Sequence, residues 1–205
     1  MLTLYYAPRS CAQAVHMLLE DAEAKYKAIK IDLTLEQQKS RQYLKINPKG
    51  RVPALITDKG ILTETPSILS YICHTHPGKN LAPSDPFEFA EAQAFNLYLA
   101  TTVHVGHAHK HRGTRWTNDE QALASLTSRV IENMYGYAEA IEKYYFKGPW
   151  VLGDNYSMCD PYLATITRWF KDDGVDLDKF PLIREHNNLI KTRSSMIKIS
   201  KLHGI

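Results

Sequence analysis

The sequence contains little cysteine: Cys11, Cys73 and Cys159 are the only three in 205 residues. Three cysteines are too few and too scattered for a disulfide framework, and no two of them have the spacing of metal ligands. The sequence therefore does not indicate a disulfide-stapled domain or a cysteine-based metal centre. At most one or two of the cysteines are expected to take part in chemistry.

Long apolar runs and clusters of one charge are also missing. No stretch approaches the roughly 20 apolar residues of a membrane helix. The opening run Met1–Tyr6 lacks the basic flank and the longer apolar segment of a signal peptide. The net charge of +3 is spread among interleaved acids and bases, which gives little support to nucleic-acid binding. We expect a cytoplasmic protein with neither membrane nor nucleic acid as a partner.

What is present in the first 75 residues is an alternation of strand-like and helix-like segments. Short aromatic or branched runs bounded by turn residues predict strands, and apolar residues at spacings of three and four predict helices. The predicted elements are a strand over 2–6, a helix from about 10, a strand over 26–33, a short helix from a Thr34-x-x-Gln37 capping box to about 44, a hairpin over 51–63, and a helix capped by Thr65 with Pro66 in its first position.

The rest of the chain reads as helical. The run from Pro77 to Pro86 contains prolines and a glycine and predicts an interdomain linker over 78–84. The domains are then 1–77 and 85–205. Helices are predicted from the Asp85-Pro-Phe-Glu88 cap to about 111, from a Thr117-x-x-Glu120 box, from a Ser157-x-x-Asp160 box, and over about 182–194.

Cys11 follows the turn Ala7–Ser10 and falls in the first turn of the first predicted helix. Unpaired N–H groups, the helix dipole and nearby Arg9 are expected to lower the pKa of a thiol there, and to hold its thiolate or that of a ligand. No second cysteine follows two residues later, so a dithiol oxidoreductase is not indicated and any reaction needs an external thiol. The alternative is a packed, inert cysteine.

Two further segments have the chemistry of a peptide-binding site. A proline before an apolar strand sits at its start, and a cis Val52-Pro53 bond would turn the backbone N–H and C=O of Val52 outward toward an extended peptide. At the next helix start, Thr65 can donate its N–H and hydroxyl to a carboxylate while Glu64 pairs with an ammonium group. A zwitterionic amino-acid end would satisfy both, although an ordinary helix cap explains the same residues.

A histidine cluster follows in the second half. His104, His107 and His111 share one face of a continuous helix, which is compatible with a metal site. Such patches are more often solvated or cleft-lining surfaces, and no metal is predicted. Cys73 is expected to be packed, and Asp160 beside Cys159 should oppose ionisation of that thiol.

Four runs together resemble the cytosolic glutathione transferase family, most closely its bacterial beta-like class: Tyr5-Tyr-Ala-Pro-Arg-Ser-Cys11, Asn47-Pro-Lys-Gly-Arg-Val-Pro-Ala-Leu55, Leu62-Thr-Glu-Thr65 and Gly153-Asp-Asn-Tyr-Ser-Met-Cys-Asp160. The resemblance spans essentially the whole chain. It implies an α/β thioredoxin-like N-terminal domain in the order βαβ-α-ββα, an all-α C-terminal helical bundle domain and a homodimer.

The resemblance also implies roles for individual residues toward glutathione as co-substrate. Cys11 would face the glutathione sulfur, with Tyr6 and Ser10 close by. Val52, before a cis Pro53, would pair with the cysteinyl backbone. The γ-glutamyl end would be held by Glu64 and Thr65, and His104 would reach the same site from the helical domain. The Ser157/Asp160 box is structural.

These residues predict an enzyme that conjugates the glutathione thiolate to small hydrophobic electrophiles held against the helical domain. One alternative is glutathione-dependent disulfide reduction, or peroxidase activity, through a mixed disulfide at Cys11. A second is a non-catalytic binding or regulatory protein on the same fold. It is motivated by two departures from the class. Val105 stands where the class often has a basic residue. The segment after Leu33 is one residue short, and the lysine that the class often has there has no clear counterpart, with Lys39 a weak substitute.

Overall fold

The computed structural model describes residues 1–205, and its first part is built on a four-stranded sheet in the order β2-β1-β3-β4. Strands β1 and β2 are parallel, whereas β3 runs antiparallel to both β1 and β4. The strands are β1 (Leu2–Tyr6), β2 (Tyr26–Lys30), β3 (Ala54–Ile56) and β4 (Ile61–Thr63).

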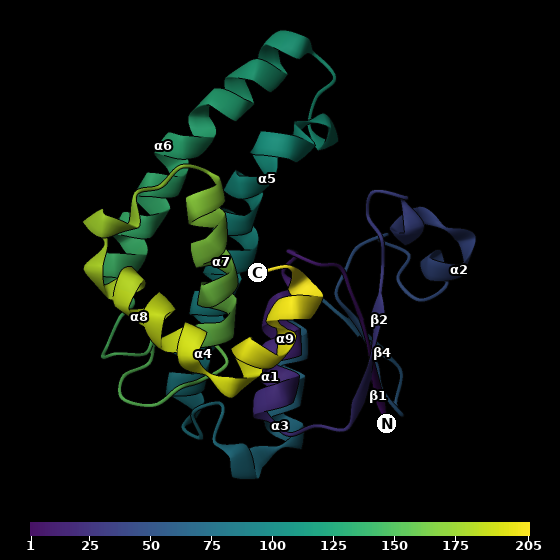
Figure 1. Ribbon diagram of the computed structural model, residues 1–205, viewed down its shortest axis with the longest axis vertical. Helices are drawn as coiled ribbons and strands as arrows, with labels where there is room; N and C mark the ends of the chain where they lie inside the picture. The colour runs from purple at the N-terminus through teal and green to yellow at the C-terminus, as the bar shows by residue number, and fades with distance from the viewer.

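Helices cover the two faces of the sheet unequally. Helices α1 (Ala12–Asp21) and α3 (Thr65–Thr75) pack together on one face, while the short helix α2 (Arg41–Leu44) lies on the other (Figure 1). Alternate residues of β1 are buried, because successive strand side chains point to opposite faces. The order βαβ-α-ββα and the thioredoxin-like N-terminal fold are thereby confirmed.

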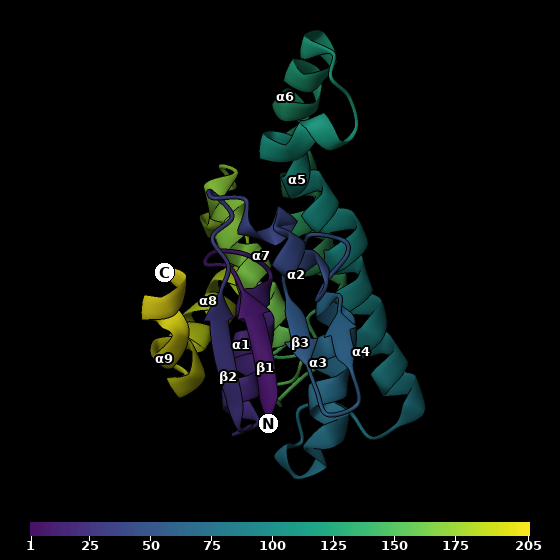
Figure 2. The same ribbon diagram turned by 90° about the vertical axis from the view of Figure 1, so that its right-hand side faces the viewer.

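The second part is helical, and one long helical rod runs along its side. Helix α4 (Pro86–Tyr98) passes through a π-helical turn at Leu99–Val103 into α5 (His104–Arg112). The remaining helices are α6 (Glu120–Tyr144), α7 (Asp160–Asp172), α8 (Pro181–Thr192) and α9 (Ser194–His203). The connected ends of α5 and α6 project beyond the sheet in both views (Figures 1 and 2). No helix combines the length and hydropathy needed to cross a bilayer.

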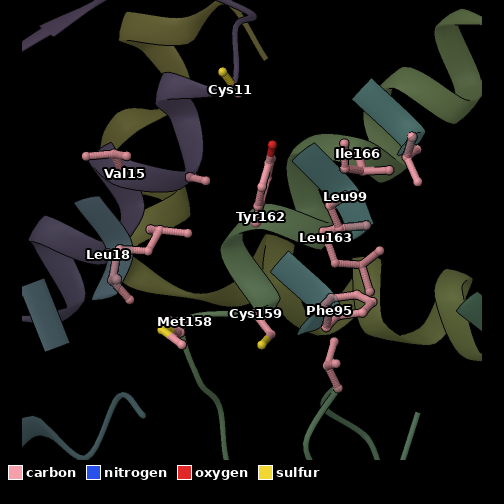
Figure 3. Close-up of a cluster of buried hydrophobic side chains, with 14 of the residues drawn as sticks. Cys11, Val15, Leu18, Phe95, Leu99, Met158, Cys159, Tyr162, Leu163 and Ile166 are labelled. Carbon is pink, nitrogen blue, oxygen red and sulfur yellow. The ribbon is translucent and has the colours of Figure 1, made fainter. Parts of the chain in front are cut away.

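One hydrophobic core joins the two parts. Helix α1 packs against α7, and a single buried cluster contains residues of both. Figure 3 shows Val15 and Leu18 on the α1 side of this core and Leu163 and Ile166 on the α7 side, with Cys11 at the upper end of α1. This packing fixes the start of α1 relative to the helical part.

Several predicted helix boundaries are confirmed and others need correction. Asp85 caps α4 as predicted, because its carboxylate accepts from the backbone N–H groups of Phe87 and Glu88. The predicted Thr34 cap is wrong: Asp32 accepts the local N–H groups, a 3₁₀ turn follows at Gln37–Lys39, and α2 starts only after the Ser40 cap. A side chain displaced by two residues satisfies the same kind of unpaired donors.

The caps of α6 and α3 also differ from the predicted ones. Asp119, not Thr117, accepts the backbone N–H of Ala122 at the start of α6. Helix α3 begins at Thr65 itself, so Glu64 occupies the cap position with a positive φ of 71°. The prediction ended the chain with one helix over about 182–194, whereas the structure has two, α8 and α9, divided at Arg193.

Candidate functional site

A large cavity of about 730 Å³ opens at the start of α1, between the sheet and helices α5 and α7. A smaller cavity of about 140 Å³ lies beside it. Cys11, Arg51, Val52, His104 and Arg115 line both, so the two form one site with two compartments. The site draws residues from both parts of the chain.

Cys11 lies at the N-cap of α1 and is buried. Its thiol faces the carbonyl oxygen of Val52, at 3.7 Å from Sγ. Burial raises the pKa of the Cys11 thiol, and the Thr65 hydroxyl and the Arg112 charge oppose this rise with smaller effects. The prediction of a lowered pKa is therefore wrong, because desolvation outweighs the charges around the sulfur.

Arg9 is not the cation that faces this thiol. Its guanidinium pairs with Asp172 at 2.8 Å, while its backbone has a positive φ of 60°. The Arg9 carbonyl accepts from Arg168 at 2.6 Å and from the Trp169 indole at 3.3 Å. Helix α7 therefore holds the loop that precedes Cys11.

Ser10 also acts on this loop. Its hydroxyl donates to the Ala7 carbonyl at 2.7 Å and accepts from the N–H of Ala12 at 3.2 Å. The side chain lines the large cavity, but both hydrogen bonds are made within the turn. Ser10 thus stabilises the turn that carries Cys11.

The segment before β3 presents Val52 to the site. The Val52-Pro53 bond is cis, as the peptide-binding interpretation requires. Tyr43 and Asn47 both donate side-chain hydrogen bonds to the Arg51 carbonyl, each at 2.7 Å. These two bonds hold the backbone next to Val52 in place.

Glu64 and Thr65 line the smaller compartment together. The Glu64 carboxylate pairs with the ammonium of Lys49, which also donates to the Thr63 hydroxyl at 2.7 Å. Glu64 therefore already binds one ammonium group, of the kind that the amino-acid interpretation assigns to it. Thr65 is buried beside Cys11.

His104 reaches the site directly after the π-helical turn, a local widening of the helix that is frequent at functional sites. Its ring centre lies 4.6 Å from that of Trp169. Burial, followed by the charge of Arg112, lowers the pKa of His104 to about 3. The imidazole is neutral near pH 7, where it can donate one hydrogen bond and accept another.

The predicted histidine face exists, since His104, His107 and His111 all line the large cavity. His107 stacks on Trp169 at 4.5 Å between ring centres and makes a 2.6 Å hydrogen bond with the buried carboxylate of Asp173. The side chains of this region form no group of metal ligands. The cleft-lining interpretation fits this face.

Tyr6 lies outside the two compartments of the site. It is buried among His16 and His203, with ring centres 5.1 Å away in both cases, and it lines neither compartment. The resemblance placed it next to the glutathione sulfur. In the structure its side chain instead packs in the layer between β1, α1 and α9.

Sequence reasoning missed the Tyr162 hydroxyl. Tyr162 is 1% exposed, lines the smaller compartment and extends from α7 toward the end of α1 that carries Cys11 (Figure 3). Burial raises its pKa well above the usual value, and the charges of Cys11 and Glu64 add to the rise. The Ser157/Asp160 box indicated that Tyr162 lies in the first turn of a helix. The direction of its side chain, however, depends on the packing of α7 on α1.

Two arginines, Arg51 and Arg115, were also missed. Arg51, Arg112 and Arg115 line the large cavity, and only four of its 18 lining residues are hydrophobic. An apolar acceptor pocket was expected from the helical domain, whereas most residues that line the observed pocket are polar or charged. The basic run 109–115 indicated a cationic surface in the helical part, but Arg51 lies far from this run in the sequence.

Comparison with known proteins is consistent with this geometry. The sequence model described as "Glutathione S-transferase, N-terminal domain" matches residues 1–74. A glutathione transferase homolog from Sulfitobacter, solved with bound glutathione, is 37% identical, with a TM-score of 0.97 over 100% of this chain and 99% of that one. These similarities support glutathione binding.

Two curated relatives from Escherichia coli extend the comparison. Glutathione S-transferase GstA of strain O157:H7 is 27% identical over 82% of this chain and 82% of its own. Disulfide-bond oxidoreductase YfcG of strain K12 is 25% identical over 94% of this chain and 91% of its own. The matches therefore cover both the sheet and the helices.

Proposed function

Because the chain belongs to the glutathione S-transferase family, we propose that it joins the thiol of glutathione to small electrophiles, with the glutathione sulfur held next to Cys11. One observation carries this proposal. The Cys11 sulfur and the Val52 carbonyl meet at 3.7 Å, beside cis-Pro53, where the two compartments join. A peptide thiol that pairs with the Val52 backbone would place its sulfur there.

The two ends of glutathione would use different groups. The γ-glutamyl carboxylate would accept from the Thr65 N–H and hydroxyl, and its ammonium would bind Glu64 in exchange for Lys49. An exposed ion pair contributes only about 0–1 kcal/mol, so this exchange costs little. The binding energy comes from the peptide backbone and the buried hydroxyl.

The chemical step is a substitution at an electrophilic carbon. Glutathione loses its thiol proton to solvent, the sulfur forms a bond to carbon, and the leaving group departs with its bonding electrons. Burial raises the pKa of Cys11, so this side chain is a thiol near neutral pH and can donate its S–H to the glutathione thiolate. Neutral His104 stands across the same space and can position the acceptor.

A second candidate is thiol–disulfide exchange. Cys11 is the one cysteine that lines this site, and the relative YfcG is named as a disulfide-bond oxidoreductase. After losing its proton to solvent, Cys11 would attack the disulfide between glutathione and a second thiol, take up the glutathionyl group and release the second thiol as its thiolate. A second glutathione would then attack the mixed disulfide, restore Cys11 and leave as oxidised glutathione.

A Cys11→Ala variant separates the two activities. If conjugation of 1-chloro-2,4-dinitrobenzene persists while disulfide reduction is lost, Cys11 serves only exchange; loss of both assigns it to both. The matched control is Cys73→Ala, since Cys73 is also buried but lies outside the site. Intact-mass spectrometry after incubation with oxidised glutathione should find an adduct on Cys11 alone.

A thermal-shift titration decides between enzyme and non-catalytic protein. A ligand of the folded state raises the melting temperature in proportion to the logarithm of its concentration above Kd. We expect glutathione to raise the midpoint, and Thr65→Val to weaken that response. An unchanged midpoint at millimolar glutathione contradicts both enzymatic candidates.

We also propose a homodimer in the cytoplasm. The dimer is supported by membership of the family, and the location by three cysteines that are all free thiols. Light scattering coupled to size-exclusion chromatography should give about twice the 23.4 kDa of one chain. A mass equal to one chain would contradict the dimer.

A further inference from the structure

Three guanidinium groups gather in the large cavity, and none of them pairs with a carboxylate. Arg51, Arg112 and Arg115 all line it, and none of them takes part in an ion pair within the chain. Arg112 and Arg115 follow one another across the end of α5, whereas Arg51 comes from the strand side. The three cations therefore converge from opposite walls of the cavity.

The other cations of this cavity are neutralised locally. Arg9 pairs with Asp172 and Lys39 pairs with Glu36. Glu36 is the one acidic residue that lines the cavity. The three arginines thus differ from their neighbours because no carboxylate forms an ion pair with them.

Burial and mutual repulsion act on two of these three charges. Burial, followed by the charges of the neighbouring arginines, lowers the pKa of Arg112 and of Arg115. Like charges in a partly desolvated site repel one another, and an anion that enters the site relieves the repulsion. The arrangement is that of a site built to receive negative charge.

Glutathione alone does not supply enough negative charge. Its γ-glutamyl carboxylate and ammonium cancel one another and are assigned to Thr65 and Glu64. Its glycyl carboxylate follows the cysteinyl unit that pairs with Val52, so Arg51, the adjacent residue, is placed to take it. Arg112 and Arg115 then remain without an anionic partner.

We propose that the acceptor is an acidic electrophile whose carboxylate is bound by Arg112 and Arg115. This inference rests on the proposed function and specifies its second substrate. Arg112 stands close enough to Cys11 to influence the thiol, and Arg115 lines both compartments. A guanidinium binds a carboxylate through two parallel hydrogen bonds, which fixes the orientation of the acceptor as well as its charge.

Two glutathione conjugates of equal shape provide the test. S-(4-carboxy-2,6-dinitrophenyl)glutathione carries the acceptor carboxylate, and S-(4-carbamoyl-2,6-dinitrophenyl)glutathione carries a neutral amide in its place. Calorimetric titration gives the Kd of each without any need for turnover. We expect the carboxylate conjugate to bind at least about tenfold more tightly, which corresponds to about 1.4 kcal/mol.

Variants assign the preference to the arginines. Arg112→Gln and Arg115→Gln should each reduce the ratio of the two Kd values, and Arg115→Lys, which keeps the charge, should retain most of it. Arg129→Gln is the matched control, because Arg129 pairs with Glu132 on the surface of α6, outside the cavity. The preference should also shrink as ionic strength rises.

The outcomes separate this inference from the function it rests on. If both conjugates bind equally well, the acidic acceptor is refuted while glutathione binding stands. If neither conjugate binds, the proposed function fails and this inference fails with it. A preference that persists in the Arg112→Gln/Arg115→Gln double variant would also overturn the assignment.

Discussion

Two buried histidines make the stability of this protein depend on pH. His16 of α1 and His203 of α9 are 1% and 0% exposed, and a hydrogen bond of 3.0 Å joins Nδ1 of His16 to Nε2 of His203. The rings of Tyr6 and Tyr26 pack around them. An added proton would place a charge in this aromatic cluster.

The size of the effect follows from the pKa values. Burial lowers the pKa of His16 to about 4 and that of His203 to about 3, against 6.5 for an unperturbed histidine. Below pH 6.5 the unfolded chain takes up protons that the folded protein refuses, so stability is full above this pH and falls as the pH falls. Between pH 7.5 and pH 5 the loss is about 2 kcal/mol per histidine, or about 4 kcal/mol for the pair.

The assay is urea unfolding followed by circular dichroism at these two pH values. The free energy of unfolding is extrapolated to water at each, and the difference is the quantity compared between proteins. His203→Gln removes one titrating ring while keeping a group that can hydrogen-bond His16. Its pH-dependent loss should be smaller than that of the wild type by about 2 kcal/mol or more.

The control must be destabilised at the same helix without losing a histidine. Ile199→Val fits, because Ile199 is a fully buried residue of α9 and the change costs about 0.5–1.5 kcal/mol. This variant should show the wild-type difference between the two pH values. Equal pH-dependent losses in His203→Gln and wild type would refute the role of the histidine pair.

Three substitutions test other parts of the fold and the site. Tyr162→Phe removes a hydroxyl that lines the smaller compartment with Cys11 and should lower kcat for aryl-halide conjugation about tenfold, or about 1.4 kcal/mol, with an almost unchanged melting temperature. Asp160→Ala deletes a buried carboxylate that accepts from Val151 at 2.9 Å and from Ser157 at 2.6 Å, and should cost about 3–5 kcal/mol in urea unfolding. Gly106→Ala would set a Cβ 2.6 Å from the Tyr137 ring, so thermal melting should show a loss of about 1–3 kcal/mol.

The fold was predictable because its signals are local. A cap such as Asp85 and the apolar spacing of the helices act over a few residues, so the sequence alone indicates them. The wrong cap predictions also concern residues close together in the sequence. Thr34 and Thr117 suit a cap as well as Asp32 and Asp119 do, and only the path of the folded backbone decides which side chain accepts the N–H hydrogen bonds. The predicted helix over about 182–194 corresponds to α8, whereas α9 was missed.

The sequence by itself determined the family, the order of the elements in the first 75 residues and the backbone groups around Val52, since each depends on contiguous residues. The tertiary structure alone decided the chemistry around Cys11. Packing of α1 on α7 desolvates the thiol and raises its pKa, and the same packing brings Tyr162 beside it. Desolvation and the summed field of Arg51, Arg112 and Arg115 depend on distances between distant segments, which no local pattern encodes.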